Sequence, residues 1–136
     1  MPLRFPGIHC FLFVVLALLV SGVISSRPRK TLVEVWCGGD DGLTQRLRDS
    51  LEKTFRSSPD FQLSSGKRPG SLMVTIPSNV PWREAKGPNR VIYAVDFASV
   101  DGLKLGSSKG ECWDGDLAKC SGHVVADAKL AARKLH

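Results

Sequence analysis

The chain has 136 residues, of which 43% are hydrophobic and 24% are charged, and its formal net charge at pH 7 is +6. This length leaves room for one domain and excludes two. The positive charge favours acidic partners such as anionic lipid, polyanionic glycan or nucleic acid. The basic residues are scattered instead of forming a long run, however, which argues against an arm that binds nucleic acid.

The first 25 residues have the three-part pattern of a secretory signal peptide. A positive charge at Arg4 precedes an apolar run from Phe11 to Val20, and small residues follow that run. The run is shorter than the about 20 apolar residues that a membrane span needs. We therefore expect residues 1–25 to be removed by cleavage after Ser25 or a neighbouring small residue. A retained membrane anchor is the alternative.

Removal of the signal leaves enough chain for one domain that buries about two-thirds of its unfolded surface. Residues 26–30 hold a proline among charged residues, and we expect them to form a flexible lead-in. The single domain would then span residues 31–136. Such a protein is exported, either to the periplasm or out of the cell, and keeps no transmembrane span.

The first part of the domain predicts a strand followed by a helix. Residues 31–37, TLVEVWC, alternate between two faces and favour a strand. The GGDDG that follows breaks the strand and offers Asp40 or Asp41 as the N-cap of a helix. We expect this helix to end near Ser58, because the residue before a proline avoids helical backbone angles. Its apolar stripe recurs every fourth residue and consists of Leu43, Leu47, Leu51 and Phe55.

Four further segments have the composition of strands: residues 61–63, 71–77, 90–98 and 103–112. The middle two alternate cleanly between apolar and polar residues, so we expect them to be half-buried antiparallel neighbours. The segment between them, PSNVPWREAKGPN, is longer than an ordinary hairpin loop, and long irregular loops are often functional. Asp101 and Gly102 predict a tight turn before the last strand.

A closing helix follows the last strand. Its apolar stripe consists of Val124, Ala128, Ala131 and Leu135. Asp116 would cap this helix, with Ser121 as the competing cap. The predicted order is β-α-β-β-β-β-α, which indicates an α+β domain with an antiparallel-rich sheet and both helices packed on one face. Such a sheet leaves its other face or an edge strand exposed, so a partner could bind by strand addition.

The cysteines predict one disulfide bond. Three remain after signal removal, so at most one bridge can form within the chain, and an exported protein is expected to form it. Cys112 ends the last strand and Cys120 begins the last helix, so the turn between them brings the two together. We therefore predict a bridge between Cys112 and Cys120, with Cys37 as a free thiol. A bridge from Cys37 to either of the others is the alternative.

The same region does not have the ligand spacing of a metal site. Asp114 and Asp116 lack the twelve-residue ligand series of a calcium loop, and the cysteines lack the close pair of a structural zinc site. The strongest catalytic hypothesis pairs Cys37 with His123 as its base. A simpler interpretation makes Cys37 a small buried hydrophobic side chain. We therefore expect no metal, no cofactor and no catalytic residue, and a cysteine-dependent enzyme is the least favoured alternative.

The long loop holds the best candidates for a binding surface. Trp82 stands beside Arg83, and an aromatic residue next to an arginine is a common anchor at interfaces. In the alternative, the indole folds back over the edge of the sheet. Arg83, Lys86 and Arg90 could together bind an anionic ligand. The two other tryptophans flank cysteines and are expected to pack in or around the core: Trp36 and Trp113.

Three stretches of the sequence resemble small exported bacterial proteins of unknown function: LTQRLRDSLEKTFRSSPDFQLSSG, RVIYAVDFAS and CWDGDLAKCSGHVVADA. In that group a helix leads into paired strands, and a two-cysteine segment precedes the final helix. The resemblance implies export and the disulfide bond, and it implies no activity.

We therefore predict a non-enzymatic protein-interaction or envelope-associated module. Its partner would be another protein or an anionic envelope component, bound at a sheet edge or at the Trp82 loop. A module that binds an anionic ligand through its basic loop is the alternative, and specific recognition of nucleic acid is not expected.

Overall fold

The computed structural model describes residues 29–135 with the exception of residues 85 and 88. The predicted signal peptide and most of the predicted lead-in lie outside the described residues, so their boundaries stay predictions. Within the part of the chain that the structure describes, no helix is long and apolar enough to cross a membrane.

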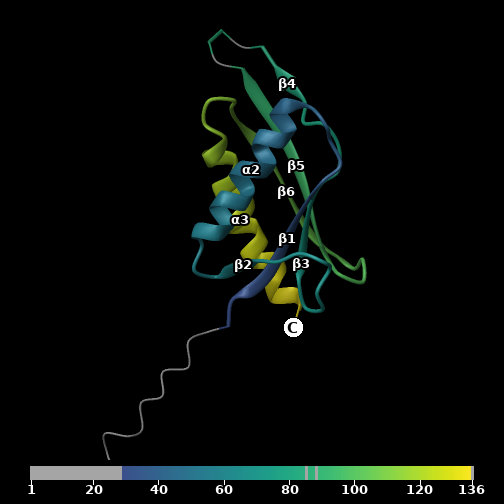
Figure 1. Ribbon diagram of the computed structural model, residues 1–136. Coiled ribbons are helices and arrows are strands. Elements are labelled where there is room, and N and C mark those ends of the chain that lie inside the picture. Colours follow the sequence, from purple (N-terminus) through teal and green to yellow (C-terminus); the bar gives the residue numbers. More distant parts are fainter. Residues whose placement is uncertain (1–28, 85, 88, 136) are drawn as a thin grey trace, which may run out of the picture.

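The described residues form a six-stranded sheet with two helices, as Figure 1 shows. Both helices lie on the same face of the sheet, and a short 3₁₀ helix, η1 (Arg133–Leu135), ends the described chain. The predicted α+β class and single domain are confirmed. The elements in chain order are β1 (Thr31–Cys37), α2 (Gly42–Ser57), β2 (Phe61–Leu63), β3 (Leu72–Ile76), β4 (Trp82–Arg83), β5 (Arg90–Ser99), β6 (Lys104–Trp113) and α3 (Leu117–Ala132).

The sheet is mixed, because β1 pairs in parallel with both β2 and β3 while β5 pairs antiparallel with β3, β4 and β6. The antiparallel pairing of β3 with β5 confirms the prediction for these neighbours. Strands β3 and β4 share one side of β5, with Thr75 opposite Asp96 and Trp82 opposite Val91. The short strand β4 lies inside the loop that the sequence predicts as irregular. It forms because the returning chain runs beside β5, where the Ile92 N–H donates to the Pro81 carbonyl at 2.9 Å.

Helix α2 begins and ends at the signals that the sequence carries. Asp41 is its N-cap, since the Thr44 N–H donates to the Asp41 carboxylate at 2.7 Å. The Thr44 hydroxyl in turn accepts from the Val80 N–H at 2.9 Å, which ties the start of the helix to the loop after β3. Ser58 has extended backbone angles before Pro59 and closes the helix. Of the two predicted caps, the structure selects Asp41.

Helix α3 begins without a side-chain cap. Asp116 occupies the predicted N-cap position but accepts no capping hydrogen bond. Ser121, the competing cap, lies inside the helix, and its hydroxyl donates to the Ser50 hydroxyl of α2 at 2.7 Å. Ser121 therefore joins the two helices and does not cap α3.

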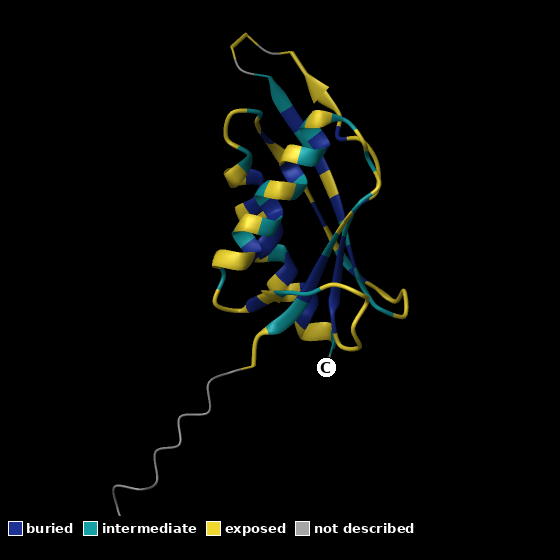
Figure 2. Ribbon diagram, in the orientation of Figure 1, coloured by how far each residue is buried: buried dark blue, intermediate teal, exposed yellow. Residues whose placement is uncertain are grey.

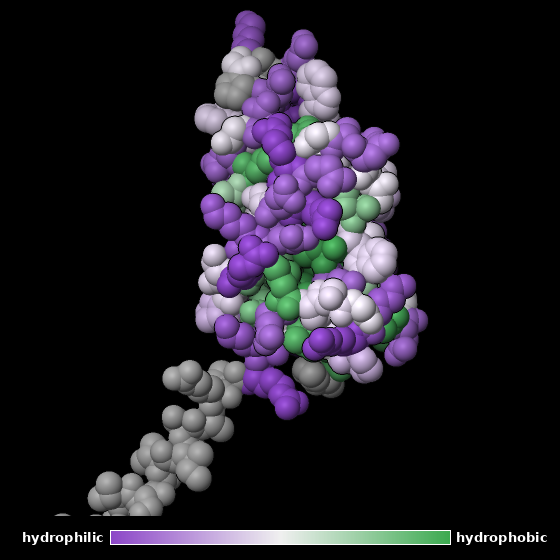
Figure 3. All heavy atoms as spheres, in the orientation of Figure 1, coloured by the Kyte–Doolittle hydropathy of each residue, from purple (hydrophilic) through white to green (hydrophobic). Residues whose placement is uncertain are grey.

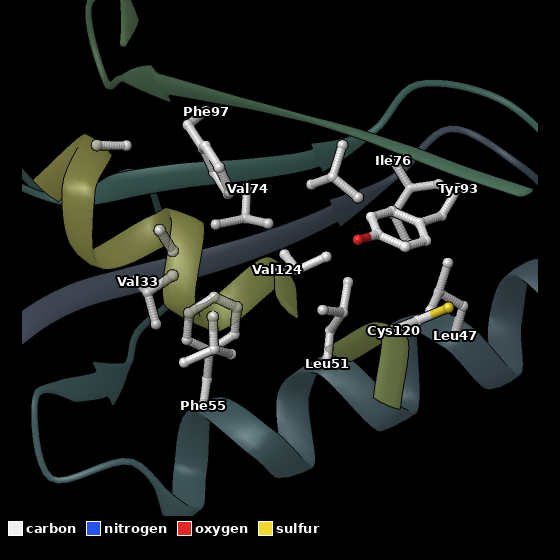
Figure 4. Packing of buried hydrophobic residues seen from close by; sticks show 14 of the residues in the cluster. Val33, Leu47, Leu51, Phe55, Val74, Ile76, Tyr93, Phe97, Cys120 and Val124 are labelled. Carbon is white, nitrogen blue, oxygen red and sulfur yellow. The ribbon is translucent and has the colours of Figure 1, made fainter. Parts of the chain in front are cut away.

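The hydrophobic core fills the space between the helices and the sheet. Figure 4 shows Leu47, Leu51 and Phe55 of α2 directed at the strands, and all three are fully buried, as predicted. The ring of Phe55 meets that of Phe61 edge-on, with centroids 5.0 Å apart. Each such side chain stabilises the fold by about 1.5–3 kcal/mol relative to exposure. In Figure 2 both helices accordingly alternate between buried and exposed residues, while most residues of β1, β3 and β5 are buried or half-buried.

The opposite face of the sheet carries two exposed tryptophans. Trp36 is 44% exposed and Trp113 is 48% exposed, so the prediction that they pack in or around the core is wrong. Strand alternation explains the result, because both indoles stand on the face that the described helices leave uncovered. Each carries a cation over its ring, with Lys67 Nζ 5.1 Å from the centroid of Trp36 and the Arg90 guanidinium 5.4 Å from that of Trp113.

Candidate functional site: the two edges of the sheet

A disulfide bond joins Cys112 at the end of β6 to Cys120 in the first turn of α3. Both cysteines are buried, and their Cα atoms are 5.7 Å apart. The intervening turn is closed by a hydrogen bond from the Asp116 N–H to the Trp113 carbonyl at 3.0 Å. The predicted pairing is therefore confirmed, and a disulfide is compatible with an exported protein.

The structure does not connect the residues of the catalytic hypothesis. Cys37 is a free, partly buried thiol whose Sγ donates to the Gly39 carbonyl at 3.3 Å. His123 lies exposed on α3, and no hydrogen bond joins it to Cys37 in the described residues. The same part of the chain also holds no cluster of three or more side chains suited to a metal ion.

The basic residues of the long loop lie at one end of the sheet, where two of them have partners. One nitrogen of Arg83 donates to both carboxylate oxygens of Glu111, at 3.0 and 3.3 Å. Arg90 is the residue whose guanidinium lies over Trp113. Lys86 is exposed. Two of the three candidate cations are therefore held against the open face of the sheet.

The backbone of Trp82 pairs with the edge of β5, and its side chain stays largely exposed, at 53%. A cavity of about 270 Å³ lies beside the indole, near the start of α2. The indole is thus accessible to a partner. The residues that line this cavity are Asp41, Leu43, Arg46, Trp82, Asn89 and Asp114.

Side chains from η1 and α3 bond to β6, one to its backbone and one to a side chain. Lys134 Nζ donates to the Leu105 carbonyl at 3.0 Å, and the Ser108 hydroxyl donates to the Asp127 carboxylate at 2.6 Å. The register with β5 also shifts between Phe97 and Ala98, which marks a bulge. Bulges and lysine side chains are devices that discourage strand pairing at an edge. The β6 edge is therefore poorly suited to strand addition.

The edge of β1 is different, because β2 covers only its first half. Strand β2 pairs with Thr31–Val33, and the pairing ends where the Ser64 N–H donates to the Val33 carbonyl at 2.9 Å. Residues 34–37 of β1 pair with β3 on their other side, and no described strand pairs with them on the side of β2.

The alternating direction of backbone groups along β1 shows which of them stay unpaired beyond the end of β2. The Thr31 N–H donates to the Asp60 carbonyl before β2, whereas the Gly38 N–H donates to the Ile76 carbonyl of β3. Successive residues of a strand direct their backbone groups to opposite sides. Val35 and Cys37 therefore direct their N–H and C=O groups away from β3, toward the side that β2 no longer covers.

A groove of about 550 Å³ lies beside Glu34 and Val35 at the start of this free stretch, between β1, α2 and the segment after β2. We call it the edge groove. Figure 3 shows hydrophobic residues exposed between the hydrophilic side chains of α2 and those of the segment below it. Within the groove lining, the Ser64 hydroxyl is buried without a hydrogen-bond partner in the described residues. The lining residues include Glu34, Val35, Arg48, Glu52, Leu63 and Ser65.

The edge groove is not among the sites predicted from the sequence, although the sequence carries one signal for it. The predicted strand 61–63 has three residues, and the strand that it pairs with, 31–37, has seven. A three-residue partner leaves half of the longer strand unpaired on that side. The prediction of an exposed edge was general, and only the pairing of β2 with β1 places the free stretch at residues 34–37.

Known proteins resemble this chain in fold. No protein-family model and no curated protein matches its sequence. Protein XCC0632 from Xanthomonas campestris, of family DUF330, is 10% identical, with a TM-score of 0.53 over 76% of this chain and 86% of that chain. The PelC dodecamer from Paraburkholderia phytofirmans is 14% identical with the same coverage and a TM-score of 0.49. Hypothetical protein CT253 from Chlamydia trachomatis is 8% identical, with a TM-score of 0.40 over 79% of this chain and 96% of that chain.

Proposed function

We propose that the protein is a non-enzymatic binding module that acts outside the cytoplasm and pairs an extended segment of another protein with the free edge of β1. The observation that carries the proposal is the coincidence of the outward-directed backbone groups of Val35 with the edge groove, with those of Cys37 continuing the same edge beyond it. A strand satisfies both the donors and the acceptors of such an edge. The disulfide bond supports an oxidising compartment.

The two sides of the edge groove indicate the chemistry of the bound segment. Val35 and Leu63 belong to the helix-facing side of the sheet and offer apolar surface, which favours apolar side chains in the partner. Glu34 belongs to the opposite side, and its carboxylate accepts from the Lys67 N–H at 2.9 Å. A bound strand presents alternate side chains to these two surfaces. The preferred partner segment therefore alternates apolar and polar residues.

The experiment compares two substitutions of exposed serines by arginine. Ser65→Arg places a long side chain in the edge groove, whereas Ser107→Arg places the same side chain on the exposed surface of β6. Extended peptides are selected from a random library on the protein, and their dissociation constants are measured by fluorescence anisotropy. We expect Ser65→Arg to weaken binding about ten-fold or more, since it removes contacts worth over one kcal/mol, and Ser107→Arg to leave binding unchanged.

Hydrogen exchange provides a second readout of the same complexes. Bound peptide should slow exchange of the Val35 and Cys37 amides, because a paired strand accepts hydrogen bonds from both. The proposal fails when selected peptides protect neither amide, or when binding survives Ser65→Arg at full strength.

The indole of Trp82 is a second candidate contact, because it is more than half exposed beside a cavity. Trp82→Ala should weaken a peptide or protein that binds at this end of the sheet. Trp36→Ala is the matched control, because that indole is similarly exposed on the opposite face. Equal effects of the two substitutions on the measured affinity would exclude a specific role for Trp82.

A further inference from the structure

The two ends of the described molecule differ in charge. At the end where α2 begins, the cavity beside Trp82 is lined by two acidic residues and one basic residue. At the end where β1 begins, two cavities of about 330 and 270 Å³ lie against the first residues of that strand. Their charged lining consists of four basic residues and one acidic residue, Asp60. We call the four basic residues the basic end: Arg29, Lys30, Lys129 and Arg133.

The fold assembles the basic end from opposite ends of the sequence. Arg29 and Lys30 precede β1, while Lys129 and Arg133 lie at the end of α3, and Figure 1 shows both segments at the same end of the molecule. Arg68 stands next to the lining residue Pro69, and Lys134 follows Arg133, so further positive charge borders the patch. This cluster of positive charge could not be predicted from the sequence, because its residues lie far apart along the chain.

The one carboxylate that lines these cavities does not neutralise the basic end. Asp60 pairs with Lys129 at 3.0 Å, and both side chains are about half exposed. Among the described residues, Arg29, Lys30 and Arg133 take part in no ion pair. The basic loop at the other end differs, because Arg83 pairs with Glu111 and two further acids, Glu84 and Asp114, lie in or beside the loop.

We propose that the basic end binds the anionic headgroups of a lipid membrane. Clusters of four or more basic residues are attracted to anionic lipid surfaces. In the alternative in which the apolar run is retained as an anchor, only eight residues separate its end at Val20 from Arg29. Eight residues span at most about 30 Å, so that membrane would lie within reach of the basic end. In the cleaved protein that we expect, the positive charge of the basic end alone supplies the attraction.

Vesicle sedimentation tests this proposal with the exported protein, its N-terminus read by mass spectrometry. Vesicles contain phosphatidylglycerol mixed into phosphatidylcholine, or phosphatidylcholine alone. We expect stronger partitioning to the anionic vesicles, and a decline as salt rises because mobile ions screen the attraction. A variant with Arg29→Glu, Lys30→Glu and Arg133→Glu should partition at least about a hundred-fold less to the anionic vesicles. Each lost basic residue contributes roughly five-fold near such a surface, and the new carboxylates add repulsion.

The control variant carries Arg83→Glu, Lys86→Glu and Arg90→Glu, which changes the net charge equally at the other end. It should retain most of its binding. Equal losses in the two variants, or equal partitioning of the unaltered protein to both vesicle types, would overturn the proposal. Thermal unfolding by circular dichroism confirms that both variants fold.

Two further comparisons separate the possible sources of binding. Inorganic phosphate added at matched ionic strength should not displace the protein beyond the effect of chloride, and complete displacement would assign the patch to a free anion. Ser65→Gln alters the edge groove without adding charge and should leave vesicle binding unchanged, so the membrane proposal stands or falls separately from the proposed function.

Discussion

Strands β6 and β1 each present a backbone edge to solvent, but among the described residues a side chain bonds to the backbone of β6 and none bonds to the free backbone groups of Val35 and Cys37. Lys134 of η1 donates to the Leu105 carbonyl of β6, and Asp127 of α3 accepts from the Ser108 hydroxyl of β6. The disulfide bond at Cys112 joins the same strand to α3. The free part of β1 lies beside the edge groove, and no comparable hydrogen bond or disulfide bond holds it among the described residues. A sheet can therefore be closed to strand addition along one edge and open along the other.

The disulfide is the largest difference between the two edges. Replacing both cysteines in Cys112→Ala/Cys120→Ala should lower the free energy of unfolding by about 2–3 kcal/mol, because the open chain regains the entropy of the closed loop. Urea denaturation measures the change. Cys37→Ala removes a thiol without a bridge and should cost less than about 1 kcal/mol. Equal losses in the two variants would show that the bridge does not stabilise the β6 edge.

The hydrogen bond from Ser108 to Asp127 should contribute the next largest effect. Ser108 is buried, so Ser108→Ala deprives the Asp127 carboxylate of a donor at 2.6 Å. The expected loss is about 1 kcal/mol in the free energy of unfolding. Ser107→Ala alters the exposed neighbour and should change the stability by less than about 0.5 kcal/mol. Similar losses in the free energy of unfolding for both serine variants would show that the hydrogen bond to Asp127 does not stabilise the β6 edge.

Amide exchange should show where the open edge of β1 begins. Val33 is paired with β2, whereas Val35 directs its N–H toward the groove. In the free protein, the Val35 amide should exchange about ten-fold or more faster than the Val33 amide, as measured by NMR. Equal exchange rates of the two amides would mean that another segment covers the edge of β1. The β1 edge would then be closed to strand addition like that of β6.

The smallest effect concerns Asp41, which follows the free part of β1. Hydrogen bonds from the Thr44 hydroxyl and then from its backbone N–H lower the pKa of Asp41 below the ordinary value of an aspartate. A carboxyl group with a lowered folded-state pKa adds stability above its unfolded-state pKa, and this is lost as pH falls through the folded-state pKa. Asp41→Ala should therefore be less stable than the unaltered protein at neutral pH, with a difference that shrinks in acid. Urea midpoints across this range measure it, and an undiminished difference in acid would contradict the assignment.

Local patterns in the sequence were sufficient for the elements and the core. The four-residue spacing of Leu47, Leu51 and Phe55 predicted the buried face of α2 because helix geometry alone determines that face. Cys112 and Cys120 could be paired because one turn separates them. The tryptophans were misplaced because alternation divides a strand into two faces without showing which face the helices will cover.

Features that depend on distant segments could not be predicted in the same way. The edge groove requires the pairing of β2 with β1 and the path of the chain after Leu63. The basic end requires Arg29 to meet Arg133, which stand at opposite ends of the described chain. Both arise from tertiary packing: the short length of residues 61–63 indicates that some longer strand is left partly unpaired, but it does not indicate which one.

The short separation of the bridged cysteines also has a kinetic consequence. Cys112 and Cys120 are eight positions apart, and a loop of that size closes in about 10–100 ns. Cys37 must close a far longer loop to reach either partner, at a greater entropic cost. When the reduced chain folds under oxidising conditions, the local pair therefore meets more often than any pair that includes Cys37. Correct oxidation is favoured by proximity along the chain, before β1 has found its place in the sheet.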